Sequence, residues 1–247
     1  MSRPPVVIAI AVLIGLVIWQ ALIWIFAFPH YILPTPGAVA EALWEYRELL
    51  GHHTIRTVHE VLLGILLGVS VGVLTALMLS WSRAARLYIR PLLIFTQGIP
   101  IYALAPIFMI WFGFGIEPKV AMAMIIIYFP VTSAFYDGLT NTPPGWVDLA
   151  RTMGASRAAV LWRIRVPAAV PSLCSGLRLA AVYAPIGAVI GEWVGGEARG
   201  LGYLMTYANS RTKIDLLFAA LIVLALFTVL LHTVTDRFGH WLTRRFT

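Results

Sequence analysis

The residues best able to do chemistry lie in two stretches of the chain. Residues 148–167, DLARTMGASRAAVLWRIRVP, hold four arginines and an aspartate, in a protein that is 60% apolar and only 12% charged. Residues 172–194 are largely apolar but include Arg178 and Glu192. Ionisable groups inside an apolar span tend to face protein or water and to mark a functional route. The second stretch therefore predicts a functional route, and the first predicts a basic surface suited either to lipid headgroups or to a protein partner.

Covalent and metal chemistry find little support in the sequence. The six histidines fall in loops or near the ends of apolar runs without the spacing of metal ligands. No Ser-His-Asp or paired-carboxylate cluster can be placed on facing helices. Cys174 is the single cysteine, so an intrachain disulfide is excluded. An intramembrane enzyme stays an alternative without an identifiable site.

The composition indicates an integral membrane protein. The 247 residues include nine tryptophans, the mean hydropathy is +0.86, and several apolar runs approach or exceed 18 residues. The net charge of +7 would also suit nucleic acid, but the arginines flank apolar runs instead of alternating with aromatic residues on one polar face. We therefore expect contact with lipid and no nucleic acid partner.

Hydropathy predicts an all-α fold with six transmembrane helices in a single domain over residues 1–247. The predicted spans are 5–28, 58–79, 91–112, 120–136, 172–194 and 216–234, with a long loop at 138–171. The first run is long and lacks a small-residue cleavage site, which favours an anchor over a removed signal peptide.

The loop charges predict that both termini are cytoplasmic. Eleven arginines would then lie on the cytoplasmic side, against six arginines and lysines on the other, and such an excess marks the cytoplasmic face. The eleven are Arg3, Arg83, Arg86, Arg90, Arg151, Arg157, Arg163, Arg165, Arg237, Arg244 and Arg245. The loop 138–171 falls on this side.

Local patterns within this loop predict two short helices. Asn141 or Thr142 is expected to cap the first helix and Gly154 to end it. Ser156 is expected to cap the second, which should stop before Pro167. A basic amphipathic pair of this kind is suited either to lying among lipid headgroups or to docking a cytoplasmic partner.

The same stretch resembles the coupling motif of permease subunits of binding-protein-dependent ABC importers. That motif is Glu-Ala-Ala, three residues, Gly, nine residues, Ile, one residue and Leu-Pro. Here the corresponding residues, in order, are Asp148, Leu149, Ala150, Gly154, Ile164, Val166 and Pro167. Three of the seven positions depart from the motif in identity, while the spacing is kept. The resemblance extends from about residue 54 to the C-terminus.

The resemblance implies a type I importer permease in a bacterial inner membrane. Its loop would insert into a groove of a separate ATPase, with Asp148 pairing with a basic or amide group. Ala150 and Gly154 would permit close approach, Ile164 belongs to the same motif, and Pro167 would fix the exit angle. The chain lacks the GxxxxGK[ST] pattern, so ATP and Mg²⁺ would be held by the partner and no cofactor by this chain.

The implied assembly has several partners. They are two cytoplasmic ATPase subunits, a second permease copy that forms a homodimer, and a periplasmic or lipid-anchored solute-binding protein. The principal alternative is a secondary transporter driven by an ion gradient. That class predicts inverted repeats and several midplane carboxylates or histidines, whereas the sequence shows no internal repeat and only Glu192 as a proton carrier.

Two of the predicted spans suggest how the solute path is built. Gly64, Gly68 and Gly72 recur every fourth residue and predict close helix packing. The stretch TQGIPIYALAP breaks the third span, and irregular backbone at membrane depth usually lines a cavity. Gln97, Pro100 and Tyr102 are therefore candidates to line the path, although a kinked helix packed on its neighbours would show the same pattern.

Each intramembrane charge of the fifth span is given a different role. Arg178 is expected to form a structural ion pair with Asp137, at the cytoplasmic end of the fourth span. Glu192 lies near the outer end of its helix without an obvious basic partner in that helix. We expect Glu192 to contact the solute or to gate the path.

The solute is suggested by resemblance to one branch of this family. The segments APIGAVIGEWVG, GLGYLM, DLLFAA, WFGFG and FPVTSAFYDGL look like those of permeases for pyrimidine precursors of thiamine. Taurine, alkanesulfonate, nitrate and bicarbonate are the alternative cargoes. Those anions favour a cationic path, whereas an intramembrane glutamate and aromatic residues suit a neutral or protonatable ring such as hydroxymethylpyrimidine.

Overall fold

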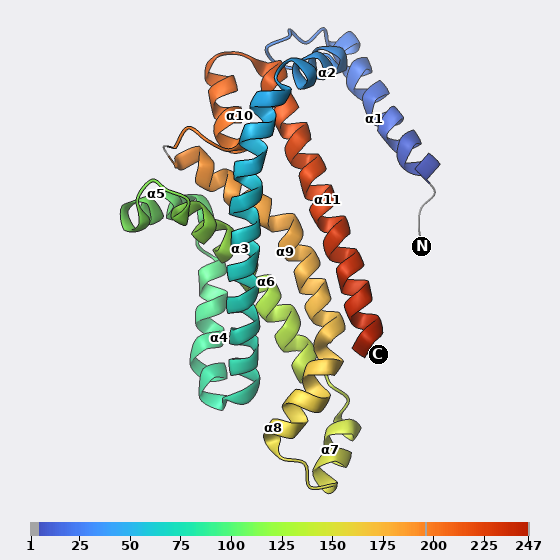
Figure 1. The fold of residues 1–247 in the computed structure, drawn as a ribbon, viewed down its shortest axis with the longest axis vertical. Coiled ribbons are helices and arrows are strands. Elements are labelled where there is room, and N and C mark those ends of the chain that lie inside the picture. The colour runs from blue at the N-terminus through green and yellow to red at the C-terminus, as the bar shows by residue number, and fades with distance from the viewer. Residues whose placement is uncertain (1–4, 196, 247) are drawn as a thin grey trace. The chain divides into compact units, whose positions relative to one another are not determined.

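The computed structural model describes residues 5–195 and 197–246, and every regular element in those residues is a helix (Figure 1). Arg3, one of the eleven arginines counted above, lies outside the described residues. The helices are α1 (Pro5–Phe26), α2 (Pro36–Glu45), α3 (Arg47–Trp81), α4 (Arg83–Gln97), α5 (Ile101–Phe112), α6 (Glu117–Thr140), α7 (Pro144–Thr152), α8 (Arg157–Val160), the π-helix η1 (Leu161–Arg165), α9 (Val166–Val194), α10 (Leu201–Ser210) and α11 (Ile214–Phe246).

The predicted all-α fold is confirmed, with up to six helical segments in the described residues that could cross a membrane. Five described segments are long and apolar enough to cross a membrane: α1, α3, α6, the continuous rod from Arg157 to Val194, and α11. The third predicted span is a bent pair, α4 and α5, whose axes turn by 104°. Counted as one span, this pair brings the total to six. It starts at Arg83 and not at residue 91, because Ser82 caps α4 by accepting a hydrogen bond from the amide of Ala85 at 3.2 Å.

The described contacts divide the chain into two compact units. The smaller unit comprises Met1–Arg56, within its described part, and Ala198–Ala225. Its core includes Val39, Leu50 and Leu204, which are almost fully buried. Trp19 donates a hydrogen bond from its indole Nε1 to the carbonyl of Pro34 at 3.0 Å. This bond ties α1 to the start of α2.

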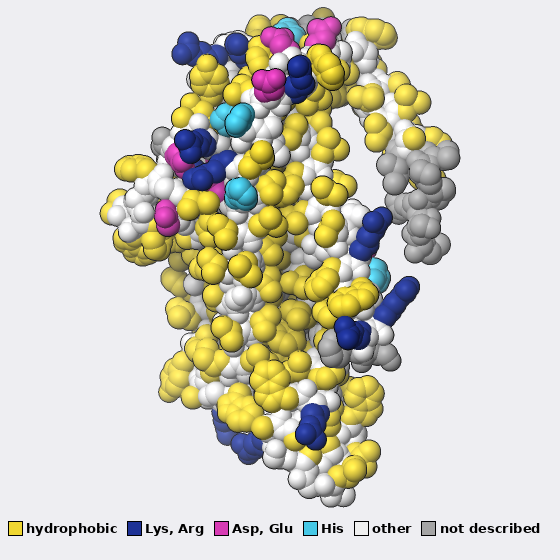
Figure 2. All heavy atoms as spheres, viewed as in Figure 1, with side chains coloured by type: hydrophobic (Ala, Val, Ile, Leu, Met, Phe, Trp, Pro, Cys, Tyr) yellow, Lys and Arg dark blue, Asp and Glu magenta, His cyan; other side chains and the backbone are white. Residues whose placement is uncertain are grey.

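The larger unit comprises Thr57–Glu197 and the described part of Leu226–Thr247, and it contains every candidate site residue. Its core is built by α3, α6 and α9, with residues such as Val61, Ile127 and Ala184 buried between them. In Figure 2 hydrophobic side chains cover the visible middle stretch of α3, and charged side chains lie toward the helix ends. This distribution suits helices that cross a bilayer.

The glycine face of α3 packs directly on α6. A Cβ built on Gly64 would lie 2.5 Å from the Cβ of Ala123, and one on Gly72 would lie 2.9 Å from the carbonyl oxygen of Tyr128. A Cβ on Gly68 would meet Ile127 at 2.4 Å. Only glycine permits this separation, so the three residues set how closely the two helices approach.

The loop 138–171 forms two short helices joined at a glycine, as in Figure 1. Gly154 follows α7 with φ +82°, a conformation that favours glycine. Ser156 caps α8 by accepting a hydrogen bond from the amide of Ala159 at 3.2 Å. The expected cap of α7 is wrong: its N-cap is Pro143, and the hydroxyl of Thr142 donates to the carbonyl of Leu139.

The predicted stop before Pro167 is also wrong. The chain passes from α8 through the π-helix η1 into α9 without a break, and Pro167 is the second residue of α9. Proline lacks an amide hydrogen and its ring crowds the carbonyl four residues earlier. The π-turn directly before it shifts the hydrogen-bond ladder: the amide of Val166 donates to the carbonyl of Leu161, five residues earlier, so the rod continues through the proline.

Candidate functional site

An apolar patch on α7 is exposed in the described chain. Trp146, Leu149 and Met153 expose 57%, 63% and 79% of their surface. Exposed apolar groups gathered on a short helix mark an interaction surface. Asp148 lies on the same helix and faces outward, 3.9 Å from the guanidinium of Arg151. These side chains form the surface that we call the α7 face.

A groove of about 690 Å³ lies between α7 and the start of α9, and Trp146 of the α7 face lines it. Its described lining includes Ala150, Ile164 and Pro167, three of the residues in the predicted motif. Leu149 and Met153 border the same groove. The structure thus brings together motif residues that are up to 17 positions apart in the sequence, between α7 and the start of α9.

A cavity of about 810 Å³ opens beside the break between α4 and α5. Gly98 ends α4 and Pro100 precedes α5, so the helical hydrogen bonds are interrupted between them. Two predicted path residues, Gln97 and Pro100, line this cavity. Tyr102 does not line it and is 58% exposed.

Aromatic and polar side chains from two further helices complete the cavity wall. Phe129 and Asp137 come from α6 and Tyr183 from α9. Of the described residues that line the cavity, Asp137 is the only charged one. The cavity therefore combines flat apolar surfaces with one anionic group, an arrangement suited to an uncharged or cationic ring.

The expected ion pair between Arg178 and Asp137 is wrong. Nε of Arg178 lies 2.7 Å from Oδ1 of Asp236 on α11. A Cβ on Gly239 would lie 3.1 Å from the Cβ of Cys174, so α11 packs closely on α9 at this level. Asp236 was overlooked because the sixth span was expected to end at residue 234, whereas α11 continues to Phe246.

A buried cluster of charges joins α3, α6 and the end of α9. The ammonium of Lys119 lies 3.3 Å from Oε1 of Glu60 and 2.9 Å from Oε2 of Glu197. The side chains of Lys119 and Glu60 are fully buried. A Cβ on Gly191 would lie 2.8 Å from Cα of Lys119, so a glycine on α9 makes room for the lysine.

Glu192 is buried on the same end of α9 and does not line the cavity. It is 1% exposed, and its Oε1 accepts a hydrogen bond from the hydroxyl of Thr57 at 2.6 Å. Thr57 lies one turn before Glu60 on α3, so Glu192 contacts the same face of α3 that carries Glu60. We call Thr57, Glu60, Lys119, Glu192 and the partly exposed Glu197 the buried charge cluster.

Sequence reasoning missed Lys119 and Glu197 as members of this cluster. Lys119 falls in the loop predicted between the spans 91–112 and 120–136, but it is the third residue of α6. One pattern in the sequence does indicate that another segment packs closely on the end of α9. Gly191 and Gly195, the residue that follows α9, are four residues apart and lie on one face. A Cβ on Gly195 would lie 3.0 Å from Cε of Lys119.

Comparison with known proteins places most of the chain among membrane transport proteins. The family model for the inner membrane component of binding-protein-dependent transport systems matches residues 64–247. A probable ABC transporter permease protein of Haemophilus influenzae is 48% identical over 94% of this chain and 92% of its own length. The formylaminopyrimidine transport permease protein ThiX of Halalkalibacterium halodurans is 35% identical, covering 87% and 86%. The riboflavin transport system permease protein RibX of Chloroflexus aurantiacus is 32% identical, covering 98% and 90%.

Solved structures support the same fold. An inward-facing form of the MetNI methionine ABC transporter contains a chain that matches with a TM-score of 0.69. The match covers 81% of this chain and 98% of that one, at 19% identity. At this identity the likeness establishes the arrangement of helices and nothing about the solute.

Proposed function

The chain belongs to the family of inner membrane components of binding-protein-dependent transport systems and is a multi-pass permease subunit of an ABC importer, and from this premise we propose that it imports a small pyrimidine precursor of thiamine. The observation that carries the choice of solute is the cavity beside the α4–α5 break. Phe129 and Tyr183 offer ring faces, and Asp137 and Gln97 offer polar partners for an amino or hydroxymethyl group.

The charge of the cavity favours this solute over the anionic alternatives. Alkanesulfonates, nitrate and bicarbonate are anions, and taurine is a zwitterion whose sulfonate also needs a cationic partner. The cavity's described lining offers them Asp137 and no cationic side chain. A protonatable pyrimidine is attracted to a carboxylate, whereas an anion is repelled. Two relatives named for heteroaromatic compounds, formylaminopyrimidine and riboflavin, support the same choice.

The mechanism we propose couples this path to a separate motor. The α7 face and the groove that it borders suit insertion into a cleft of a cytoplasmic ATPase, which holds ATP and Mg²⁺. Asp148 pairs with a basic or amide group there, Ala150 and Gly154 allow close approach, and Pro167 sits where the groove meets α9. The complete transporter contains two such ATPases, a homodimer of this chain and an external binding protein. Both termini of the permease lie in the cytoplasm.

We assign the outer gate to Glu192 within the buried charge cluster. The cluster links α3, α6 and α9 through Lys119 and through the bond from Thr57. Separating these helices would expose several charges at once, so the cluster favours a closed outer end until the binding protein docks. Gln97, Pro100 and the exposed Tyr102 then form the inner part of the path.

The test is reconstitution of the full transporter in liposomes with its binding protein. We expect uptake of hydroxymethylpyrimidine or formylaminopyrimidine that requires ATP, with taurine and nitrate failing to compete. Asp137→Asn should reduce uptake of the protonatable pyrimidine, and Asp215→Asn on α11 serves as the matched control outside the cavity. ATP-dependent uptake of taurine in preference to pyrimidine would contradict the proposed solute. Uptake driven by a proton gradient without ATP would identify a secondary transporter.

A further inference from the structure

Five arginines surround one pocket of about 550 Å³ at the α7 end of the larger unit. They come from three segments that are far apart in the sequence: Arg83 and Arg86 begin α4, Arg151 ends α7, and Arg157 and Arg165 lie in the rod that leads into α9. Of the ten described residues that line the pocket, five are arginines and none is acidic. The α7 face and the solute cavity do not explain this concentration of positive charge.

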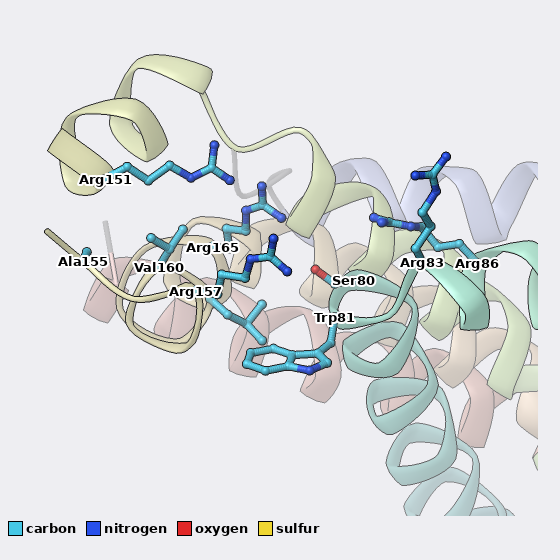
Figure 3. Close-up of a pocket in the computed structure, with 10 residues that line it drawn as sticks. Ser80, Trp81, Arg83, Arg86, Arg151, Ala155, Arg157, Val160 and Arg165 are labelled. Atoms are coloured by element: carbon cyan, nitrogen blue, oxygen red, sulfur yellow. The ribbon is translucent and has the colours of Figure 1, made fainter.

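The arginines converge on one space. In Figure 3 Arg151, Arg157 and Arg165 extend from one side toward Ser80, while Arg83 and Arg86 lie on the other side of Ser80. Guanidinium groups held together in this way repel one another. The pair of Arg151 with Asp148 is long, at 3.9 Å, and both side chains are largely exposed, so it offsets little of that repulsion. An anion in the pocket would offset it directly.

Two hydrogen-bonding atoms at the pocket point to the same class of ligand. Nε of Arg165 and Oγ of Ser80 are both buried, and neither has a hydrogen-bond partner among the described residues. Buried polar atoms in folded proteins nearly always have a partner. An oxygen-rich anion between these two residues would accept from the guanidinium and from the hydroxyl.

The local helix geometry also favours an anion. The first turn of α4 carries Arg83 and Arg86 and no acidic residue. The amino end of a helix has a partial positive charge, so two arginines there are unfavourable unless an anion is near. Trp81, which lines the pocket, is 58% exposed, and exposed tryptophans are enriched at the level of lipid headgroups.

We propose that this pocket binds the phosphate of an anionic phospholipid headgroup. Arginine forks match phosphate oxygens, and basic pockets between transmembrane helices bind phosphate-bearing headgroups such as that of cardiolipin. The bound lipid holds the start of α4 against Arg157 and Arg165 in the rod that carries the coupling loop. Free phosphate has the same chemistry, and the experiment separates the two sources.

The test uses the full chain purified in neutral detergent, with thermal unfolding as the readout. We compare the wild type with R157Q/R165Q and with the control R244Q/R245Q, which removes two charges from the last turn of α11. Each protein is titrated with cardiolipin, phosphatidylglycerol, phosphatidylcholine and inorganic phosphate. Cardiolipin and phosphatidylglycerol should raise the unfolding temperature of the wild type and the control, and phosphatidylcholine should not. R157Q/R165Q should bind the anionic lipids about tenfold more weakly or worse.

A folding defect in the double variant can be recognised without lipid. Removing two repelling charges should leave its unfolding temperature, in the absence of any anion, at or above that of the wild type. R83Q, on the opposite side of the pocket, should show the same weakened response to lipid. Equal responses to lipid in R157Q/R165Q, R83Q and wild type would overturn the proposal. A response to inorganic phosphate but not to lipid would overturn the lipid source. If added ATPase stabilises the wild type and none of the lipids does, the arginines belong to a protein contact instead.

Discussion

The ammonium of Lys119 lies 3.3 Å from the carboxylate of Glu60, and both side chains are fully buried. One residue begins α6 and the other lies in the middle part of α3, so the pair fixes two helices that also meet through glycines. Buried charges of this kind are costly to expose singly. The pair therefore constrains the stability of the larger unit and, under the proposed function, the opening of its outer end.

Replacing Lys119 with methionine should destabilise the protein. The variant keeps an unbranched apolar stem but removes the positive charge next to Glu60 and Glu197, and breaking a buried pair costs about 3–5 kcal/mol. Thermal unfolding in detergent measures the loss. K213M is the control, because Lys213 is exposed and its Nζ lies 3.4 Å from the hydroxyl of Tyr46. The double variant K119M/E60Q should recover part of the lost stability. An unchanged unfolding temperature for K119M would show that the pair does not stabilise the fold.

Replacing Gly64 with alanine should separate α3 from α6. The new methyl group would lie 2.5 Å from the Cβ of Ala123, and overpacking of this size costs about 1–3 kcal/mol. Gly51 lies on the same helix with nothing within 4 Å of a built Cβ. There the same substitution should be neutral or stabilise by up to about 1 kcal/mol through helix propensity. Similar unfolding temperatures for G64A and G51A would be inconsistent with close glycine packing.

Replacing Met153 with aspartate should prevent docking of the ATPase. Met153 is 79% exposed at the end of α7, so the charge should not disturb folding, yet it would be buried in the complex. Copurification of permease and ATPase should fall at least about tenfold, while membrane insertion is kept. Gly154→Glu should have the same effect, with added strain because of φ +82°. A40D on α2 is the matched control. Normal transport by M153D would show that the α7 face is not the surface that docks the ATPase.

Weakening the bond between Thr57 and Glu192 should loosen the outer gate. T57V removes the donor while keeping the side-chain shape, and E192Q keeps an acceptor but removes the charge. A hydrogen bond to a charged group contributes about 1.5–3 kcal/mol. Basal ATP hydrolysis by the reconstituted transporter should therefore rise roughly tenfold in T57V, with less stimulation by the loaded binding protein. E45Q on α2 is the control. If T57V and E192Q both show basal and stimulated rates of ATP hydrolysis equal to those of the wild type, Glu192 is not the gate.

The proposed topology predicts where a reporter that is active only in the cytoplasm will work. Fusions after Ala155 and after Arg245 should be active, because both positions lie on the side with the excess of arginines. A fusion after Ser210, at the end of α10, should be inactive. Activity at Ser210 together with silence at Ala155 would reverse the orientation.

The sequence predicted the apolar helices and the two short helices of the loop 138–171 because each depends on local pattern. Apolar runs of about 20 residues identify a transmembrane helix wherever it packs, and Ser156 and Gly154 act within one helical turn. The break of the third span was likewise visible at Gly98 and Pro100, although its 104° angle was not.

Long-range partners could not be predicted in the same way. Arg178 pairs with Asp236, 58 positions later, and Lys119 meets Glu60, 59 positions earlier. Their proximity depends on how α3, α6, α9 and α11 pack, which no single-segment pattern encodes. Asp137 was a reasonable partner for Arg178 by depth alone, but depth does not specify which neighbouring helix faces a residue.

The π-helix Leu161–Arg165 gives the rod that leads into α9 one extra residue in a single turn. A π-turn holds one more residue than an α-turn. Deleting one of these five residues would therefore replace the π-turn with an α-turn that covers about the same angle, so α8 would keep roughly its rotational position relative to α9. A deletion within the regular part of α9 has no extra residue to absorb it and would rotate everything before it by about 100° relative to the rest of the helix. Arg157 would then turn away from Ser80. We therefore expect a one-residue deletion to be tolerated at the π-helix and not in the α-helical turns beside it.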